Sequence, residues 1–146
     1  MAEKPMQALI DTAKSGQLSM SFSNNVFVNA DEFVYIDRDC QAMKDEIRQL
    51  QRMAEVISER ETWGLGEGAA WIRSAKILVG TFRSKAKGSA DGNDVHAILQ
   101  QHWEIIDSIQ QLHKEIAQRY QQADTDFAAR YNELMATLPQ GFQGQK

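Results

Sequence analysis

Residues 29–57 read NADEFVYIDRDCQAMKDEIRQLQRMAEVI, and this stretch decides the fold. Asn29 is a residue type that caps helices, and Glu32 three positions later completes a capping-box pattern. Apolar side chains then recur at alternating steps of three and four, the heptad spacing of helices that pack side by side. The pattern therefore predicts a long amphipathic helix that ends within residues 58–62. The apolar seam of this helix comprises Phe33, Ile36, Cys40, Met43, Ile47, Leu50, Ala54 and Ile57.

A glycine-rich segment, Trp63-Gly-Leu-Gly-Glu-Gly68, follows this helix. Each of its three glycines would cost a helix about 1 kcal/mol of stability. Apolar spacing resumes between Ile72 and Ala86 in a shifted register, which indicates a kink or an interruption at the glycines. The pattern leaves open whether the first helix bends or stops at residues 64–68.

A second turn is predicted at residues 88–94, with Asn93 or Asp94 as the cap of the next helix. The three–four spacing then continues as far as Leu134, and Pro139 ends it. At about 1.5 Å per residue, this predicts one unbroken helix of roughly 65 Å. Its seam contains Val95, Ile98, His102, Ile105, Ile109, Leu112, Ile116, Tyr120, Ala123, Phe127, Tyr131 and Leu134.

These segments predict an all-α fold, namely an elongated antiparallel helical hairpin whose first arm is interrupted. Trp71, Leu78, Trp103 and Ile106 lie beside the main seam and widen it. Because a two-helix hairpin leaves such apolar surface uncovered, we expect a partner that completes a four-helix bundle. The core and dimer seam is predicted to consist of Phe33, Ile36, Met43, Ile47, Leu50, Ile57, Ile98, Ile105, Ile109, Leu112 and Ile116.

An N-terminal extension precedes the hairpin. Pro5 suits a first helical turn and Gly16 suits the end of a short helix. Residues 18–23 alternate apolar and polar side chains, as an extended arm across helices or one strand of a small β-hairpin would. The predicted organisation is therefore an extension at residues 1–28, a helical hairpin domain at residues 29–138 and a flexible tail at residues 139–146.

Composition excludes several function classes. The chain has 146 residues, which suits one domain, and its net charge of −4 argues against a general nucleic-acid binder. A single cysteine, Cys40, excludes an internal disulfide, and its place on the seam favours a core residue over a reactive thiol. The chain has no run of about 18 apolar residues and no signal-peptide pattern, so membrane contact is not indicated. We expect a protein that stays in the cytoplasm or leaves it without a cleaved signal peptide.

Catalytic and metal-binding patterns are missing from the sequence. None of the three histidines follows a glutamate at the Glu-x-x-His spacing of helical di-metal sites, and His102 lies on the seam as a packing residue would. There is no phosphate-binding loop and no nucleophile elbow. We therefore expect no enzyme activity, no cofactor and no metal. The segment from Arg73 to Lys87 carries five basic residues and no acidic one, which suits a solvated face or a surface that orients a partner helix.

An aromatic residue and an acid lie four positions apart late in the last predicted helix. Tyr120 and Asp124 would share one helix face, because positions i and i+4 are neighbours. Tyr35 and Asp39 repeat this bare spacing near the start of the first helix, so the pair by itself carries little information. The surroundings separate the two copies, because apolar residues follow Asp124 three and seven positions later, whereas Asp39 has a glutamate at the second offset.

The stretch of Tyr120, Asp124, Phe127 and Tyr131 resembles the export signal of type VII (ESX-type) secretion substrates. The segment of Trp63, Gly64, Leu65 and Gly66 is similar to the Trp-x-Gly turn of the WXG100 class, whose members are helical hairpins, although the triplet is not strict. The resemblance covers residues 30–135, and the chain is longer than typical members, like the larger actinobacterial relatives of the class.

The resemblance implies a non-enzymatic secretion substrate or secretion partner, released without a cleaved signal peptide. A type VII export ATPase would read Tyr120, Asp124, Phe127 and Tyr131. Trp63, Gly64 and Gly66 would form the turn motif, and the partner would be a second helical-hairpin protein in a heterodimer or homodimer. The alternative is a cytoplasmic coiled-coil structural or adaptor protein with no export role. A helical nucleic-acid or membrane-surface binder is disfavoured by the acidic total.

Overall fold

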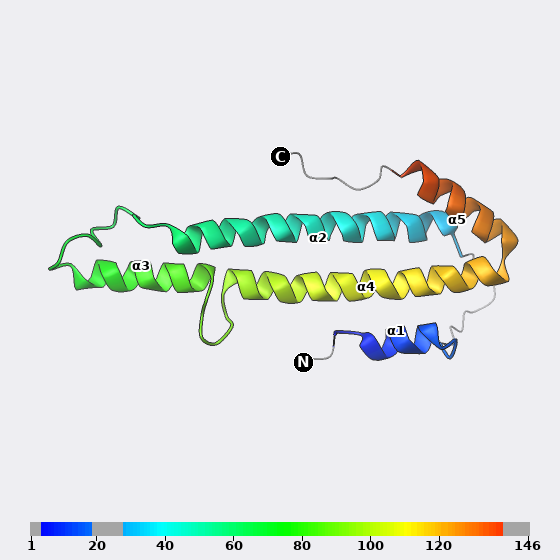
Figure 1. Cartoon of the computed structure of the whole chain (residues 1–146), viewed down its shortest axis with the longest axis horizontal. Helices are drawn as coiled ribbons and strands as arrows, with labels where there is room; N and C mark the ends of the chain where they lie inside the picture. Colours follow the sequence, from blue (N-terminus) through cyan, green and yellow to red (C-terminus); the bar gives the residue numbers. More distant parts are fainter. Residues whose placement is uncertain (1–3, 19–27, 139–146) are drawn as a thin grey trace. The chain divides into compact units, whose positions relative to one another are not determined.

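The computed structural model describes residues 4–18 and 28–138, and these residues form five α-helices and no strand. The all-α class predicted from the sequence is therefore confirmed. The predicted extended arm beyond Leu18, its turn and the tail at residues 139–146 lie outside the described residues. The helices are α1 (Gln7–Lys14), α2 (Ala30–Glu59), α3 (Arg73–Ala86), α4 (Val95–Ala123) and α5 (Thr125–Thr137) (Figure 1).

The chain divides into two compact units. Unit 1 comprises Met1–Ala42 and Ile106–Lys146, and unit 2 comprises Met43–Ile105. Unit 1 therefore contains α1, the first part of α2, the last part of α4, and α5. Unit 2 contains the rest of α2 and of α4, with α3 between them in the sequence.

In unit 1, the short helix α1 packs through Ile10 and Ala13, which are almost completely buried. Gly16 lies just beyond its end, where the sequence predicted it, and the amide of the next residue donates to the carbonyl of Thr12 at 3.0 Å. Arg119 of α4 donates from Nε to the carbonyl of Ala13 at 2.8 Å. This bond adds a side-chain donor from α4 to a carbonyl at the end of α1 that also accepts from the amide of Gly16 at 3.2 Å.

The part of α2 in unit 1 runs antiparallel to the part of α4 in the same unit. The Asp37 carboxylate accepts a hydrogen bond from Gln110 at 2.8 Å and forms an ion pair with Lys114 at 3.0 Å. One turn earlier on α2, Val34 is fully buried, and Ala117 on α4 is 1% exposed. Asn29 accepts a hydrogen bond from the amide of Asp31 at 3.0 Å, which confirms its capping role.

The structure corrects the prediction of one helix from residue 94 to residue 138. Helix α4 ends at Ala123 and α5 begins at Thr125, with Asp124 between them in extended conformation (φ −136°, ψ 114°). The carboxylate of Asp124 accepts hydrogen bonds from the amides of the second and third residues that follow it, which is the role of an N-cap. The apolar spacing continues across the break, so periodicity could not reveal it.

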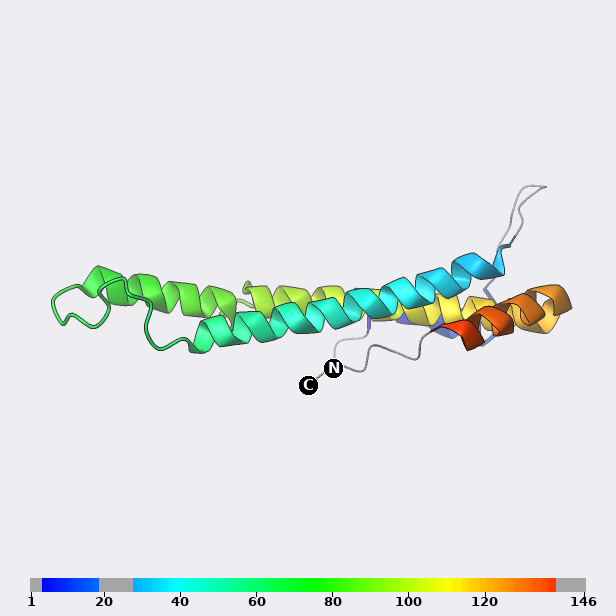
Figure 2. The same cartoon turned by 90° about the horizontal axis from the view of Figure 1, so that it is seen from above.

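In unit 2, the chain reverses its direction within residues 60–72, and α3 and the first part of α4 then run in one direction, antiparallel to α2 (Figure 1, Figure 2). This corrects the prediction of an interrupted first arm, because the interruption at residues 87–94 separates two helices of the returning segment. The question whether the first helix bends or stops is answered too, since α2 ends at Glu59. The contacts that define the direction are, in order along α2, Gln51 with His96, Glu55 with Lys87 and Arg60 with Arg83.

The loop before α4 is closed by Asp94, one of the two caps that the sequence offered. Its Oδ1 accepts from the amide of Ala97 at 2.8 Å, while Oδ2 accepts from the amides of Gly88 at 3.1 Å and Ser89 at 2.9 Å. These bonds hold the pKa of Asp94 below its usual range, and the bond from the amide of Ala97 contributes most to this shift. One carboxylate therefore caps α4 and fixes the start of the preceding loop.

Candidate functional site

The predicted export-signal residues lie in unit 1, where α4 and α5 meet. Phe127 of α5 is 6% exposed and lies edge-on to Phe33 of α2, with 5.8 Å between the ring centroids. Tyr120 of α4 is half-buried, 5.5 Å from the ring of Phe127 and 6.1 Å from that of Phe33. Tyr131, also half-buried, stacks on Phe127 at 6.0 Å. We call these four residues the aromatic cluster.

Asp124 lies beside the cluster but has a different environment. It is exposed, and Oδ1 accepts from the amides of Asp126 at 2.9 Å and Phe127 at 3.0 Å. Its own amide donates to the carbonyl of Tyr120 at 2.8 Å. Tyr120 and Asp124 therefore do not form the helix-face pair that the spacing predicted, because Tyr120 belongs to the end of α4 and Asp124 starts α5.

A charged clamp joins α5 to the start of α2. The guanidinium of Arg130 donates to both carboxylate oxygens of Asp31, from Nε at 2.8 Å and from Nη2 at 2.9 Å. Nη1 donates to Glu133 at 3.1 Å on the same helix. The hydrogen bond from Arg130 lowers the pKa of Asp31, and the bonds to Asp31 and then to Glu133 raise the pKa of Arg130. The clamp is thus a second contact between α5 and α2, beside that of Phe127 with Phe33.

Burial, together with the nearby carboxylate of Asp37, raises the pKa of Tyr131 above its usual range, so its phenol stays neutral at physiological pH. Among residues 4–18 and 28–138, no group of three or more histidine, cysteine, aspartate or glutamate side chains is placed to hold a metal ion. No helix in the described part of the chain has the length and apolar character needed to cross a bilayer.

The other copy of the tyrosine–aspartate spacing, Tyr35 and Asp39, lies within α2. Tyr35 is 38% exposed, and the guanidinium of Arg38 lies 5.1 Å from the centre of its ring. Arg38 also donates to Asp39 from Nε at 2.8 Å. Tyr35 and Asp39 are thus exposed on one face of α2, and both contact Arg38. In the other copy, Tyr120 packs in the aromatic cluster and Asp124 caps α5.

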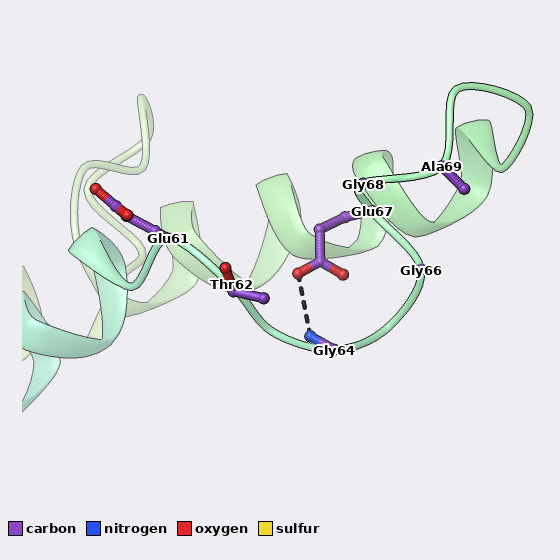
Figure 3. A pocket seen from close by; sticks show the side chains of 7 residues that line it. All are labelled: Glu61, Thr62, Gly64, Gly66, Glu67, Gly68 and Ala69. Carbon is purple, nitrogen blue, oxygen red and sulfur yellow. Dashed lines mark hydrogen bonds between the residues drawn. The ribbon is translucent and has the colours of Figure 1, made fainter.

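The predicted turn motif lies in unit 2, in the segment where the chain reverses. The backbone of Gly64 and Gly66 is in the left-handed region, with φ of 74° and 89°, which glycine adopts without strain. Glu67 folds back across the loop, and its carboxylate accepts from the amide of Gly64 at 3.1 Å (Figure 3). It also accepts from the amides of Trp63 and of Leu65, the latter at 2.8 Å. The bond from the amide of Trp63 contributes most to lowering the pKa of Glu67 to about 2.

Trp63 fixes this loop to α3. Its ring stacks on Phe82 with 5.6 Å between centroids, and its Nε1 donates to the carbonyl of Arg60 at 3.1 Å. Arg83 of α3 donates to the carbonyls of Arg60 and Glu61 at 2.6 and 2.9 Å, so it satisfies backbone groups just beyond the end of α2. A shallow pocket of about 510 Å³ opens over the glycines and Glu67 (Figure 3).

The predicted core and dimer seam is divided by burial. In unit 1 its members are half-buried, whereas in unit 2 only Ile47 is buried. Lys44 and Gln51 are also buried in unit 2, beside small apolar residues such as Ala54 and Val79, and Arg48 lies 4.4 Å from the ring centre of Trp103. The half-buried members are Phe33, Ile36, Ile109, Leu112 and Ile116. The exposed members are Met43, Leu50, Ile57, Ile98 and Ile105.

Sequence reasoning missed the residues that hold both sites in place. Asp31 and Arg130 are 99 positions apart, and no local pattern couples them. Glu67 carried a usable signal, because a carboxylate inside a glycine-rich turn can accept from several amides of that turn. Comparison of the chain with protein-family models, with curated proteins and with solved structures gave no match.

Proposed function

We propose that this chain is a non-enzymatic substrate or secretion partner of a type VII (ESX-type) secretion system, exported without a cleaved signal peptide. Tyr120, Asp124, Phe127 and Tyr131 would form the export signal. The observation that carries the proposal is the junction of α4 and α5, where an exposed carboxylate caps one helix beside a cluster of aromatic rings. The half-buried rings of Tyr120 and Tyr131 beside one exposed carboxylate combine apolar area with a charge, as recognition sites do.

The corrected chain direction supports the proposal. In the resembled WXG100 class, the Trp-x-Gly element lies at the turn of a helical hairpin. Trp63 and Gly64 lie in the segment where unit 2 reverses its direction, whereas the sequence had suggested the turn at residues 88–94. The Tyr-x-x-x-Asp element of the class follows the second arm, and Asp124 follows the end of α4. The Trp-Gly element and the Tyr-x-x-x-Asp element thus follow the same order as in the resembled class, the first in a turn and the second at the end of α4.

Recognition of the signal requires a change at the junction. Tyr120 and Phe127 pack on Phe33, so an export ATPase that reads both rings must displace α5 from α2. The Arg130–Asp31 clamp opposes this movement. Exposed ion pairs contribute little free energy, so the clamp can open without unfolding α2 or α4. We infer that α5 leaves the cluster when the ATPase binds.

A helical partner belongs to the same proposal. The exposed apolar side chains of α2 and α4 in unit 2 suit a hairpin that forms a four-helix bundle with a second hairpin. The partner would then cover unit 2 while the junction in unit 1 is read. The export signal in unit 1 and the exposed apolar seam in unit 2 would thus bind different proteins.

The proposal is tested by secretion of variants from a bacterium that has a type VII system. Tyr120→Ala and Asp124→Ala should remove the protein from the culture medium while the cells still contain it. Tyr35→Ala and Asp39→Ala are the matched controls, because they change the same residue types at the same spacing, and they should be secreted like the parent. Circular dichroism of each purified variant separates loss of recognition from loss of fold. Parent-level secretion of both Tyr120→Ala and Asp124→Ala would reject the proposal.

The second candidate is a cytoplasmic coiled-coil structural or adaptor protein. One observation favours it: Tyr120 and Phe127 already have a packing role, so their sequence pattern has a structural explanation. In that case Tyr120→Ala would lower stability, and no form of the protein would reach the medium. Secretion of the parent chain decides between the two candidates.

A further inference from the structure

The first part of α3 projects beyond the end of α2 in unit 2. Arg83 of α3 donates to the carbonyl of Arg60, which follows the last residue of α2, and the two helices run antiparallel. Residues 73–82 therefore lie past the end of α2, as Figure 1 and Figure 2 both show. We call residues 64–82, the glycine-rich loop together with this part of α3, the α3 overhang.

The loop covers only one side of α3 in the overhang. A Cβ atom at Gly66 would lie 3.2 Å from Cδ1 of Ile72 and 4.0 Å from Cβ of Ala75, so the loop lies against the face of α3 that contains the buried Ala75. Successive helix residues point about 100° apart, which places Arg73 and Ile77 on the side of α3 away from Ala75. Ile77 is 68% exposed, and Arg73 is exposed as well. In the described part of the chain, this side of the overhang is open to solvent.

The overhang exposes large apolar side chains on more than one side. Trp71 in the loop is 84% exposed, the highest value among the large apolar side chains of the described residues. Ile77 and Leu78 are both exposed, and as consecutive helix residues they point about 100° apart. A partner helix would cover a single stripe, whereas an apolar layer of lipid can surround a projecting end. The distribution therefore favours a bilayer surface, a boundary at which tryptophan is enriched.

Basic residues dominate the charge around these apolar side chains. Between Glu61 and Asp91 the chain has five basic residues and one acidic residue, whereas the whole chain has 16 basic and 20 acidic residues. The one acidic residue is Glu67, whose carboxylate accepts from three amides of its own loop. The exposed basic residues are Arg73, Lys76 and Lys85. The acidic total, which disfavoured a membrane-surface binder, therefore does not describe this segment, whose charge is complementary to anionic lipid headgroups.

We propose that the α3 overhang binds the surface of bilayers that contain anionic lipids. Trp71 and Ile77 would lie between the headgroups and the acyl chains, while Arg73 and Lys76 pair with the anionic headgroups. The proposal goes beyond the proposed function and does not depend on it, because an exported protein and a cytoplasmic one both meet membrane surfaces.

Cosedimentation of the purified full chain with lipid vesicles tests the proposal. The chain should bind vesicles of equal parts phosphatidylglycerol and phosphatidylcholine, and it should bind pure phosphatidylcholine vesicles more weakly by about tenfold or more. Equal binding to both kinds of vesicle, or no binding to the anionic ones, would overturn the proposal. Binding to polyglutamate without binding to anionic vesicles would also overturn it, because the overhang would then be a surface for an acidic protein.

A matched pair of variants tests the apolar contact. Ile77→Ser should weaken binding to the anionic vesicles about tenfold, because it removes an apolar side chain from the lipid interface. Val56→Ser is the control, at a residue of α2 that is also 68% exposed, and it should bind like the parent. Circular dichroism shows whether each variant keeps its helices. Equal losses of binding in the two folded variants would contradict a contact at the overhang.

A second pair tests the charges. Arg73→Gln/Lys76→Gln should weaken binding to the anionic vesicles by about tenfold or more. Lys14→Gln/Arg52→Gln removes the same number of charges from exposed positions outside the overhang and should have little effect. If both double variants lose the same affinity, only the net charge matters and the proposed site is wrong. None of these variants changes the export-signal residues, so the vesicle test and the secretion test can fail separately.

Discussion

In unit 1, Val34 of α2, Ala117 of α4 and Phe127 of α5 are almost fully buried, beside the polar contact of Asp37 with Gln110. In unit 2, Ile47 and Ala54 of α2 are buried beside Lys44 and Gln51, while the larger aliphatic residues Leu50, Met53 and Ile57 are exposed. One helix thus buries or half-buries its seam residues at one end and leaves most of them exposed at the other. The difference teaches that heptad spacing marks an apolar helix face but does not by itself say whether the fold covers that face.

The largest effect is expected from the core of unit 1. Phe127→Ala should lower the free energy of unfolding by about 3–5 kcal/mol, because it removes a buried ring that contacts Phe33, Tyr120 and Tyr131. Its counterpart in unit 2 is Val56→Ala, at a residue of α2 that is 68% exposed. That change should stay within about 0.5 kcal/mol. Urea unfolding followed by circular dichroism measures the free energy of unfolding of both variants. Similar losses of stability in the two variants would contradict the difference in packing between the units.

A smaller effect is expected at the cap between α4 and α5. Asp124→Ala should cost about 1 kcal/mol, because the amides of Asp126 and Phe127 lose their acceptor. Asp124→Ser keeps a capping oxygen and should unfold close to the parent. Thermal unfolding of the three proteins measures the difference. If Asp124→Ser keeps stability but loses secretion, the carboxylate itself is recognised; a serine variant as unstable as the alanine one would contradict the capping role.

The smallest effect concerns pH at the turn in unit 2. The pKa of Glu67 is about 2, below the value of about 4.3 usual for glutamate, so its hydrogen bonds favour the ionised form. This stabilisation is present above the usual pKa and is lost as pH falls from about 4.5 towards 2. Glu67→Gln should remove that part of the acid dependence. Acid titration of the environment of Trp63 by fluorescence, with Trp71 and Trp103 replaced by phenylalanine, measures it; identical curves for parent and variant would contradict the assignment.

Much of the fold was predictable, because its determinants are local. The cap at Asn29, the end of α2 within residues 58–62, the turn before α4 and the end of α1 near Gly16 all follow from residue types and spacing. The break at Asp124 was not predictable from spacing, because the apolar rhythm continues through it. The direction of α3 was not predictable either, because it depends on contacts such as Arg83 with Arg60 across the turn.

The candidate site was predictable in its residues but not in its geometry. The sequence selected Tyr120 over Tyr35 by the apolar residues that follow Asp124; of these, Phe127 contacts Tyr120, and Tyr131 stacks on Phe127. It did not predict that Phe33 would join them, or that Arg130 would reach Asp31. Such long-range pairs are set by tertiary packing, which a single sequence does not display.

The loop around Glu67 has one more consequence. Three consecutive amides converge on its carboxylate, and converging amides of this kind form a concavity that binds anions. In this protein the bound anion belongs to the chain itself, so the concavity is closed to phosphate and sulfate at neutral pH. Replacing Glu67 with alanine would therefore leave three neighbouring amides without the acceptor that the parent chain supplies internally.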